Sequence, residues 1–194
     1  MALWRSTGSA RVARAMAAVP RVGYLPHGQR GYAAQDRALP IGFDATCSQP
    51  STVTVMLELL EVPAGASVLD VGSGSGWTTA ILAHLVGPTG SVRGVEIVSE
   101  LVDLAAERLR AADLPWASVA LAREGVLGLP EAGPFDRILV SADGGQVPDA
   151  LVAQLVEGGR MVLPAAGRLV LVELVDGAPR TSYAPGRYAF VPLR

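Results

Sequence analysis

The sequence predicts an α/β fold built on a doubly wound, mostly parallel sheet. From residue 67 onward, short apolar runs alternate with stretches of helical periodicity, which is the pattern of βαβ units. Runs such as Arg137-Ile138-Leu139-Val140 are almost wholly apolar, as is typical of strands in a sheet covered on both faces. The first apolar run ends in a glycine-rich loop that leads into a helical stretch. The 194 residues suit one domain, so we expect a single domain over residues 1–194.

The apolar periodicity locates the expected elements. Helices are expected at residues 9–19, 50–60, 76–86, 99–112 and 148–156. Strands are expected at residues 67–71, 91–96, 117–122, 135–141, 159–164, 168–175 and 187–192. A link rich in Gly and Pro joins the last two strands, which we expect to form an antiparallel C-terminal pair. Residues 20–50 show little periodicity but are too apolar for a disordered tail, and long irregular stretches of this kind are usually functional.

The composition is that of a globular protein. Half of the residues are apolar and 18% are charged, and the net charge of −2 gives no overall nucleic-acid footprint. Cys47 is the only cysteine, which excludes an intrachain disulfide and a cysteine cluster for zinc. Apolar runs are too short for a membrane span, and residues 1–8 lack an apolar signal core. We therefore expect a cytoplasmic monomer that binds no metal, nucleic acid or membrane.

The N-terminal part of the chain is locally basic. Residues 1–38 contain six arginines and one acid, Asp36. A basic lobe of this kind attracts an acidic substrate or forms an ordinary solvated surface, and the sequence leaves both interpretations open.

Residues 68–76 and Glu96 together indicate a nucleoside site. Glycines at 72, 74 and 76 let the backbone approach a ligand where any Cβ would clash. The next strand, 91–96, delivers the Glu96 carboxylate to the same edge of the sheet, where it is placed to accept hydrogen bonds from ribose hydroxyls. A dinucleotide fingerprint requires Gly or Ala at the sixth motif position, and Trp77 stands there instead. The alternative is that the carboxylates are ordinary strand-end acids and the glycines only shape a turn.

The glycines follow an acidic residue, Asp70, in the order G-x-G-x-G, which resembles motif I of S-adenosylmethionine-dependent methyltransferases. This resemblance implies a Rossmann-like class I methyltransferase with S-adenosylmethionine as its cofactor. It divides the chain into an N-terminal substrate-side segment, residues 1–62, and a cofactor-binding core, residues 63–194. An acid near the loop suits a cofactor whose methionine end is cationic.

A second resemblance covers residues 15 to 193 in order. The segments that carry it are Ala15-Met16, Val19-Pro20-Arg21, Tyr32, Leu39-Pro40-Ile41-Gly42, Thr46, Ser48-Gln49-Pro50, the glycine-rich loop, Glu124-Gly125 with Gly128 and Pro130, Gly133-Pro134-Phe135-Asp136, Val147-Pro148, Gln154-Leu155, Gly158-Gly159-Arg160, Pro164 and Phe190-Val191-Pro192-Leu193. Together they resemble the protein-L-isoaspartate O-methyltransferase family.

The family resemblance implies methyl transfer from S-adenosylmethionine to the α-carboxylate of an L-isoaspartyl residue. The ester then closes to a succinimide, which reopens to normal aspartate. The implied partner is a protein or peptide with an isoaspartyl or aspartyl carboxylate. Such a carboxylate is ionised at pH 7 and needs no general base. We therefore expect His27 and His84, the only histidines, to be structural.

The resemblance also implies the site residues. Thr46 and Ser48, in the strip between cofactor and substrate, are the catalytic candidates, and Ser48 as a simple cap of the helix at Pro50 is the alternative. Glu124 is implied to receive the adenine amino group, and a loop acid without a partner is the alternative. The implied cofactor-binding residues are Asp70, Gly72, Ser73, Gly74, Gly76, Glu96, Ile97, Glu124 and Gly125. The implied substrate-binding residues are Ile41, Gly42, Asp44, Ala45, Thr46 and Ser48.

The substrate side departs from the family pattern. Asp44-Ala45 stand where Gly-Gln is usual, Cys47 replaces a β-branched residue, and the segment between Pro164 and Leu171 is short. A carboxylate at position 44 repels an anionic acceptor unless a cation offsets it. Two alternatives therefore remain open: an enzyme dedicated to one precursor peptide, in which an Asp side chain is methylated and cyclises to an aspartimide, and a non-catalytic S-adenosylmethionine binder.

Overall fold

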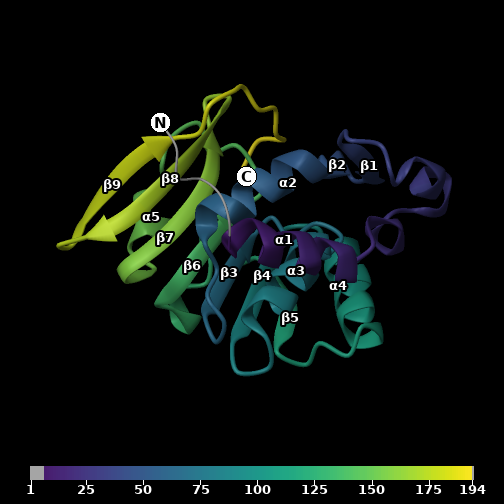
Figure 1. Ribbon diagram of the computed structural model, residues 1–194, viewed down its shortest axis with the longest axis horizontal. Coiled ribbons are helices and arrows are strands. Elements are labelled where there is room, and N and C mark those ends of the chain that lie inside the picture. Colours follow the sequence, from purple (N-terminus) through teal and green to yellow (C-terminus); the bar gives the residue numbers. More distant parts are fainter. Residues whose placement is uncertain (1–6, 194) are drawn as a thin grey trace.

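The computed structural model describes residues 7–193, with side chains from residue 10 onward. Its centre is a seven-stranded sheet in the order β5-β4-β3-β6-β7-β8-β9 (Figure 1). Neighbouring strands from β5 to β7 run parallel, while β8 and β9 are antiparallel additions at one edge. The strands are β3 (Ser67–Val71), β4 (Ser91–Glu96), β5 (Ala117–Leu121), β6 (Phe135–Val140), β7 (Leu155–Ala165), β8 (Arg168–Val175) and β9 (Ala178–Tyr183). The predicted α/β class with a mostly parallel sheet is confirmed.

Both faces of the sheet are covered, because the chain winds in two directions from β3. Going outward through β4 to β5, it places α3 (Trp77–Val86) and α4 (Ser99–Ala111) on one face. Helix α2 (Pro50–Leu60) also packs on this face, against β6, β7 and β8, and α1 (Thr7–Ala18) packs against α2 and α3. The return through β6 and β7 places α5 (Asp149–Val152) on the other face. The winding direction therefore reverses between β3 and β6, which is where open α/β sheets bind ligands.

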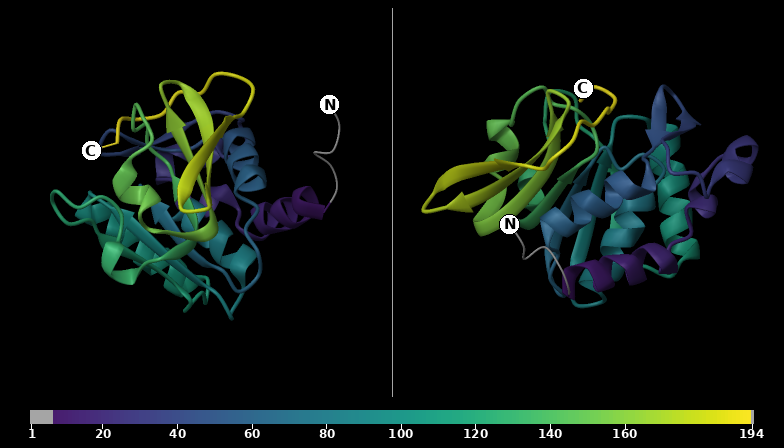
Figure 2. Two further views of the ribbon diagram at one scale, coloured as in Figure 1. Left: turned by 90° about the vertical axis from the view of Figure 1, so that its left-hand side faces the viewer. Right: turned by 45° about the horizontal axis from the view of Figure 1, so that its top comes forward.

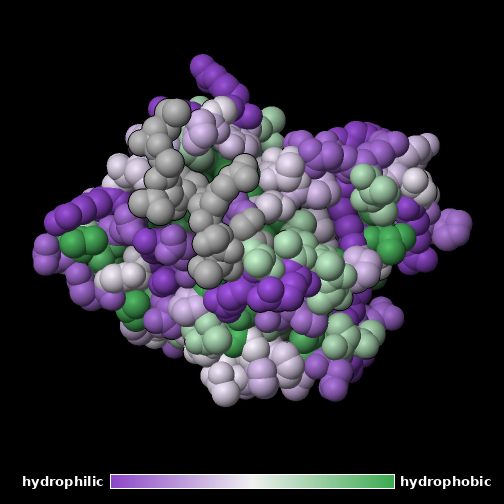
Figure 3. All heavy atoms as spheres, viewed as in Figure 1, coloured by the Kyte–Doolittle hydropathy of each residue, from purple (hydrophilic) through white to green (hydrophobic). Residues whose placement is uncertain are grey.

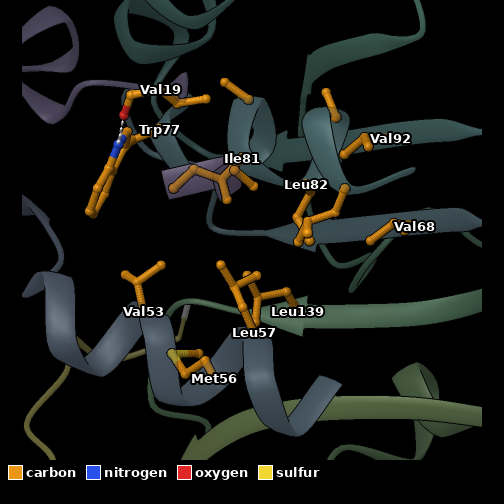
Figure 4. Close-up of a cluster of buried hydrophobic side chains, with 14 of the residues drawn as sticks. Val19, Val53, Met56, Leu57, Val68, Trp77, Ile81, Leu82, Val92 and Leu139 are labelled. Atoms are coloured by element: carbon orange, nitrogen blue, oxygen red, sulfur yellow. Dashed lines mark hydrogen bonds between the residues drawn. The ribbon is translucent and has the colours of Figure 1, made fainter. Parts of the chain in front are cut away.

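The larger apolar cluster joins the N-terminal helices to the sheet. Figure 4 shows side chains of α2 and α3 meeting strand residues such as Val68 and Leu139. Trp77, the residue that excludes a dinucleotide fingerprint, is buried there. Its indole N–H donates to the carbonyl of Val19, the residue that follows α1, at 3.0 Å, and this hydrogen bond connects the end of α1 to α3. A buried indole is satisfied only by such a partner.

The irregular segment of residues 20–50 folds into two 3-10 turns and a small hairpin. These are η1 (Arg21–Tyr24), η2 (His27–Tyr32), β1 (Leu39–Gly42) and β2 (Ala45–Cys47). The segment projects from one end of the body, away from β8 and β9 at the other (Figure 2). The Phe43-Asp44 turn has φ of 56° and 58°, as a two-residue type I′ turn requires.

A buried arginine holds this segment together. Arg21 is 6% exposed, and its guanidinium donates to the carbonyls of Gln35, Arg37 and Cys47 at 3.1, 2.7 and 2.7 Å. The guanidinium also lies 5.5 Å from the centre of the Trp77 ring. Arg21 therefore sets the position of β2 relative to α3.

Two predictions at the C-terminal end are wrong. The expected strand at 187–192 is absent from the sheet, and the edge strand is β9 instead. β8 turns into β9 at Asp176-Gly177, where φ values of 54° and 72° form a two-residue hairpin turn. Asp-Gly is a strong hairpin signal, and it lies inside the Gly- and Pro-rich link of residues 176–186. The expected helix at 148–156 is only the single turn α5, because β7 already begins at Leu155.

β3, β4, β8 and α2 have the predicted bounds, whereas β7 begins four residues before the strand predicted at 159–164. The ends of α1, α3, α4, β5 and β6 lie within two residues of their predicted ranges. Within residues 7–193, no helix combines the length and the apolar character that crossing a membrane requires. On the face shown in Figure 3, apolar residues are interspersed in small groups among hydrophilic ones.

Candidate functional site

A cavity of about 860 Å³ opens at the carboxyl ends of β3, β4 and β6, where the winding direction reverses. Its walls are formed by parts of the chain that are far apart in sequence: the β1–β2 hairpin, the glycine-rich loop, the loop after β5 and the C-terminal residues. Its lining residues are 43–48, 71–75, 95–98, 122–128 and 191–193, with Trp77, Thr78, Ser141, Ala142, Gly144, Gln146 and Pro148.

The glycine-rich loop presents its backbone to this cavity. Gly72 and Gly74 line it with φ of 74° and 53°, in the left-handed region that favours glycine. Gly76 does not line the cavity and serves a packing role instead. A Cβ on Gly76 would lie 2.9 Å from the Cβ of Ala105, so the missing side chain lets α4 approach the start of α3. Arg108 of α4 also donates to the Ser75 carbonyl at 3.0 Å, which braces the loop.

Glu96 lies at the end of β4, is 7% exposed and lines the cavity. Its Oε2 accepts a hydrogen bond from the backbone N–H of Gly74 at 2.8 Å. Its Oε1 accepts from the N–H groups of Ile97 and Val98 at 2.8 and 3.1 Å. A carboxylate offers about four acceptor positions, so one position on Oε2 remains for a ligand hydroxyl. The same carboxylate therefore braces the loop and faces the cavity.

Asp70 lies beneath the loop and does not line the cavity. It is fully buried, and its Oδ2 accepts from the hydroxyls of Thr78 and Thr79 at 2.8 and 2.7 Å, at the start of α3. Among the described residues, its Oδ1 has no hydrogen-bond partner. Burial raises the pKa of Asp70 to about 6, and the nearby Glu96 charge adds to the rise, whereas the two threonine hydroxyls oppose it.

The hairpin brings the predicted strip of hydroxyls to the cavity. Thr46 and Ser48 both line it, with Thr46 exposed and Ser48 half-buried, and Asp44 and Ala45 lie beside them. Ile41 is buried behind this wall, with its Cδ1 3.3 Å from the position of a Cβ on Gly74, and Gly42 is exposed outside the lining.

The alternative role of Ser48 as a helix cap is wrong. Helix α2 begins at Pro50 with Gln49 at the N-cap, and no side chain of the cap residue closes it. The first free N–H group of the helix, at Ser51, donates instead to Asp36 at 2.9 Å. That backbone hydrogen bond is the main cause that lowers the pKa of Asp36. Ser48 is thus left to face the cavity.

The loop after β5 forms the opposite side of the cavity. Glu124 and Gly125 line it and are exposed, and Ile97 beside them is 51% exposed on the rim. Arg123 forms an ion pair of 2.7 Å with Glu131 across the loop. Neither His27 nor His84 belongs to the lining, and both are exposed. Among the described residues, no group of three or more His, Cys, Asp or Glu side chains is arranged to hold a metal ion.

Sequence reasoning missed two parts of the lining. Ser141 and Ala142 directly follow β6. Their position in the lining could be predicted from the sequence, because strand ends where the winding direction reverses face the ligand. The C-terminal residues Val191–Leu193 close one wall of the cavity, although the sequence predicts a strand at 187–192. They are attached to Asp143 by hydrogen bonds from its N–H to the Val191 carbonyl and from the Leu193 N–H to its carbonyl, at 2.8 and 2.9 Å.

The sheet order, the glycine-rich loop and the acid at the end of β4 define an S-adenosylmethionine-dependent methyltransferase of the Rossmann-like class. A family model described as protein-L-isoaspartate(D-aspartate) O-methyltransferase matches residues 3–193, and the chain belongs to this family. Among curated relatives, a protein-L-isoaspartate O-methyltransferase of Methanococcoides burtonii is 41% identical over 187 residues, which cover 94% of this chain and 91% of the relative.

Solved structures agree with this assignment. A protein-L-isoaspartate O-methyltransferase structure aligns with a TM-score of 0.87 and 26% identity over 96% of this chain, which spans 62% of that longer protein. A Plasmodium falciparum chain described as a β-aspartate methyltransferase, in complex with S-adenosyl-L-homocysteine, aligns with a TM-score of 0.80 and 25% identity, over 95% of this chain and 90% of that one. The predicted family and fold are therefore confirmed.

Proposed function

We propose that the protein transfers a methyl group from S-adenosylmethionine to the α-carboxylate of L-isoaspartyl residues in proteins or peptides. The observation that carries this proposal is that Thr46 and Ser48 line the same cavity as the glycine-rich loop and Glu96. A cofactor site and an acceptor site therefore share one space. The curated relatives carry the isoaspartate name, which supports this acceptor over a single dedicated peptide.

The residues present fit S-adenosylmethionine. Glu96 has one free acceptor position for a ribose hydroxyl, and Gly72 and Gly74 leave room for close backbone approach. Ile97, half exposed on the rim, offers an apolar surface for the adenine ring, and Glu124 offers an acceptor for its amino group. When bound, the cofactor supplies an electrophilic methyl group on a cationic sulfur. The cavity carboxylates of Asp44, Glu96 and Glu124 favour that positive charge.

The chain's own contribution to the transfer is orientation. An isoaspartyl carboxylate is ionised at neutral pH, so no residue is required to remove a proton from it. The hydroxyls of Thr46 and Ser48 are donors on the acceptor side of the cavity, and they hold the attacking carboxylate in line. Arg21 fixes this strip from behind through the Cys47 carbonyl.

Apolar side chains limit water in the cavity. Val71, Trp77 and Leu127 line it, together with Val191 and Leu193 of the C-terminal strip. Water exclusion strengthens the hydrogen bonds that orient the acceptor and reduces competing hydrolysis. Cys47 also lines the cavity, but burial raises the pKa of its thiol and keeps the thiol protonated and unreactive.

The test is methyl transfer from labelled S-adenosylmethionine to a short isoaspartyl peptide, with the same peptide carrying normal aspartate as the control. Transfer to the isoaspartyl form alone supports the proposal. Cofactor binding without transfer to either peptide contradicts the proposal. It supports one of the two alternatives, an enzyme dedicated to one precursor peptide or a non-catalytic S-adenosylmethionine binder. Equal transfer to both peptides would show that the site recognises aspartyl side chains in general.

A further inference from the structure

The connection from β5 to β6 forms one side of the cavity without an α-helix. Residues 122–134 contain only the 3-10 turn η3 (Pro130–Ala132). Seven of these residues, 122–128, line the cavity. An irregular connection lacks the repeating i→i−4 hydrogen bonds that hold a helix, so contacts with the rest of the protein must set its position.

One side chain from a distant part of the chain supplies such contacts. Gln154, between α5 and β7, is 5% exposed. Its Oε1 accepts a hydrogen bond from the Leu129 N–H at 2.8 Å, and its Nε2 donates to the Leu127 carbonyl at 2.9 Å. The second N–H of Nε2 donates to the Ala150 carbonyl at 2.8 Å. The amide therefore bridges both sides of Gly128 in the way that a neighbouring β-strand would.

Only a carboxamide satisfies these three partners. Glutamine offers two N–H donors and a carbonyl acceptor, and all are used here on two carbonyls and one N–H. A carboxylate would place an acceptor against two carbonyl oxygens, and an apolar side chain would leave three part-buried backbone groups without this partner.

The loop is shaped to receive this amide. Gly128 has φ of +79°, and a Cβ built on it would lie 2.6 Å from the Oε1 of Gln154 and 2.8 Å from the Nε2. The missing side chain lets the Gln154 amide reach the backbone on both sides. Gly128 and Leu127 themselves line the cavity, so the contact lies directly behind the cavity wall.

We propose that Gln154 is a positioning residue for cofactor binding, which acts by holding the loop of residues 122–128 in its binding shape. The inference rests on the proposed function, because it assigns that loop, with Glu124 and Gly125, to the cofactor side of the cavity. Gln154 itself does not line the cavity. When the loop holds the competent shape for only part of the time, the apparent dissociation constant rises by the inverse of that fraction.

The experiment is calorimetric titration of the full chain with S-adenosylhomocysteine. Gln154→Glu keeps the size of the side chain and removes both donors, and Gln154→Met removes all polar contacts. We expect either change to raise the dissociation constant about tenfold, with an unchanged binding stoichiometry. Gln29→Glu and Gln29→Met are the matched controls, because Gln29 lies in η2 and not in the cavity lining.

Steady-state kinetics separate positioning from general damage. The KM for S-adenosylmethionine should rise, while kcat at saturating cofactor and the KM for the acceptor peptide stay unchanged. A purely structural role would lower the melting temperature or the binding stoichiometry and leave the dissociation constant unchanged, which overturns the inference. Failure of the parent protein to bind S-adenosylhomocysteine would instead overturn the proposed function.

Gly128→Ala tests the same contact from the loop side. Its Cβ would push against the Gln154 amide, and we expect a similar rise in the dissociation constant. If the Gln154 variants do not fold, this variant alone decides the question. An unchanged dissociation constant in folded Gly128→Ala would overturn the inference.

Discussion

Replacement of Glu96 by Gln tests the double role of this carboxylate. Three backbone N–H groups share its two oxygens, those of Gly74, Ile97 and Val98, and one acceptor position on Oε2 faces the cavity. A glutamine amide has one oxygen, which serves either Gly74 or the Ile97–Val98 pair. If the oxygen keeps the pair, the Gly74 N–H faces an NH2 group and the free acceptor position is lost.

Both losses have measurable sizes. One buried N–H without an acceptor costs about 1–3 kcal/mol of folding stability, which lowers the melting temperature by roughly 2–4 °C per kcal/mol for a chain of this size. Loss of the ligand hydrogen bond, together with a displaced loop, should weaken S-adenosylhomocysteine binding by about 1–2 kcal/mol, or about 5- to 30-fold.

Calorimetry and thermal unfolding measure the two effects separately. Glu100→Gln is the matched control, because Glu100 is exposed in the first turn of α4 and this substitution makes the same change in net charge as Glu96→Gln. A lower melting temperature with unchanged cofactor affinity would refute the reasoning, because Glu96 would then be only a loop brace. Equal weakening in the Glu100 variant would show a long-range charge effect.

Three further predictions concern Asp70, Ser48 and Asp44. Since burial raises the pKa of Asp70 from 3.8 to about 6, the folded protein keeps a proton that the unfolded chain has released between these values, and stability should fall as pH rises through that window. Asp70→Asn should remove this decline in melting temperature, and an equal decline in the variant would contradict the assignment. Ser48→Ala should lower turnover about tenfold or more, with cofactor affinity and melting temperature unchanged, because Ser48 lines the cavity without capping α2; parental turnover would remove it from the reaction. Asp44→Asn should lower the KM for isoaspartyl peptides by about two- to fivefold, and by more for peptides with acidic neighbours than for peptides with neutral ones, since Asp44 is exposed on the acceptor side and the acceptor carboxylate is itself anionic. The difference should vanish in high salt, and a difference that persists there would argue against a charge effect.

Sequence patterns predicted most of the sheet and the cofactor side of the site. Buried parallel strands are continuous apolar runs, and the connecting helices have a distinct period, so 67–71 and 91–96 were located as observed. Gly72, Gly74 and Glu96 lie in short motifs beside these strands. The topology of a parallel sheet brings such strand ends to one edge, and all three line the cavity.

The C-terminal part was predicted less well, because its signals depend on partners elsewhere. The run 187–192 is apolar and was assigned to a strand, yet its last residues cover the cavity and bond to Asp143 after β6. None of residues 187–192 is fully buried, and a short apolar run that covers a cavity has the same sequence pattern as a short strand. The Asp176-Gly177 turn, a local signal, was available and was missed.

The sequence by itself determined the α/β class, the glycine-rich loop and the acid that follows the next strand, because each depends on local periodicity or on residues close together in the chain. Only the tertiary structure decided that Asp70 supports α3 from beneath, that Asp36 rather than Ser48 caps α2, and that Gln154 holds the loop after β5. These roles join residues that are between 8 and 27 positions apart. Side-chain hydrogen bonds over such separations form only after the chain has folded, when burial removes water as the competing partner.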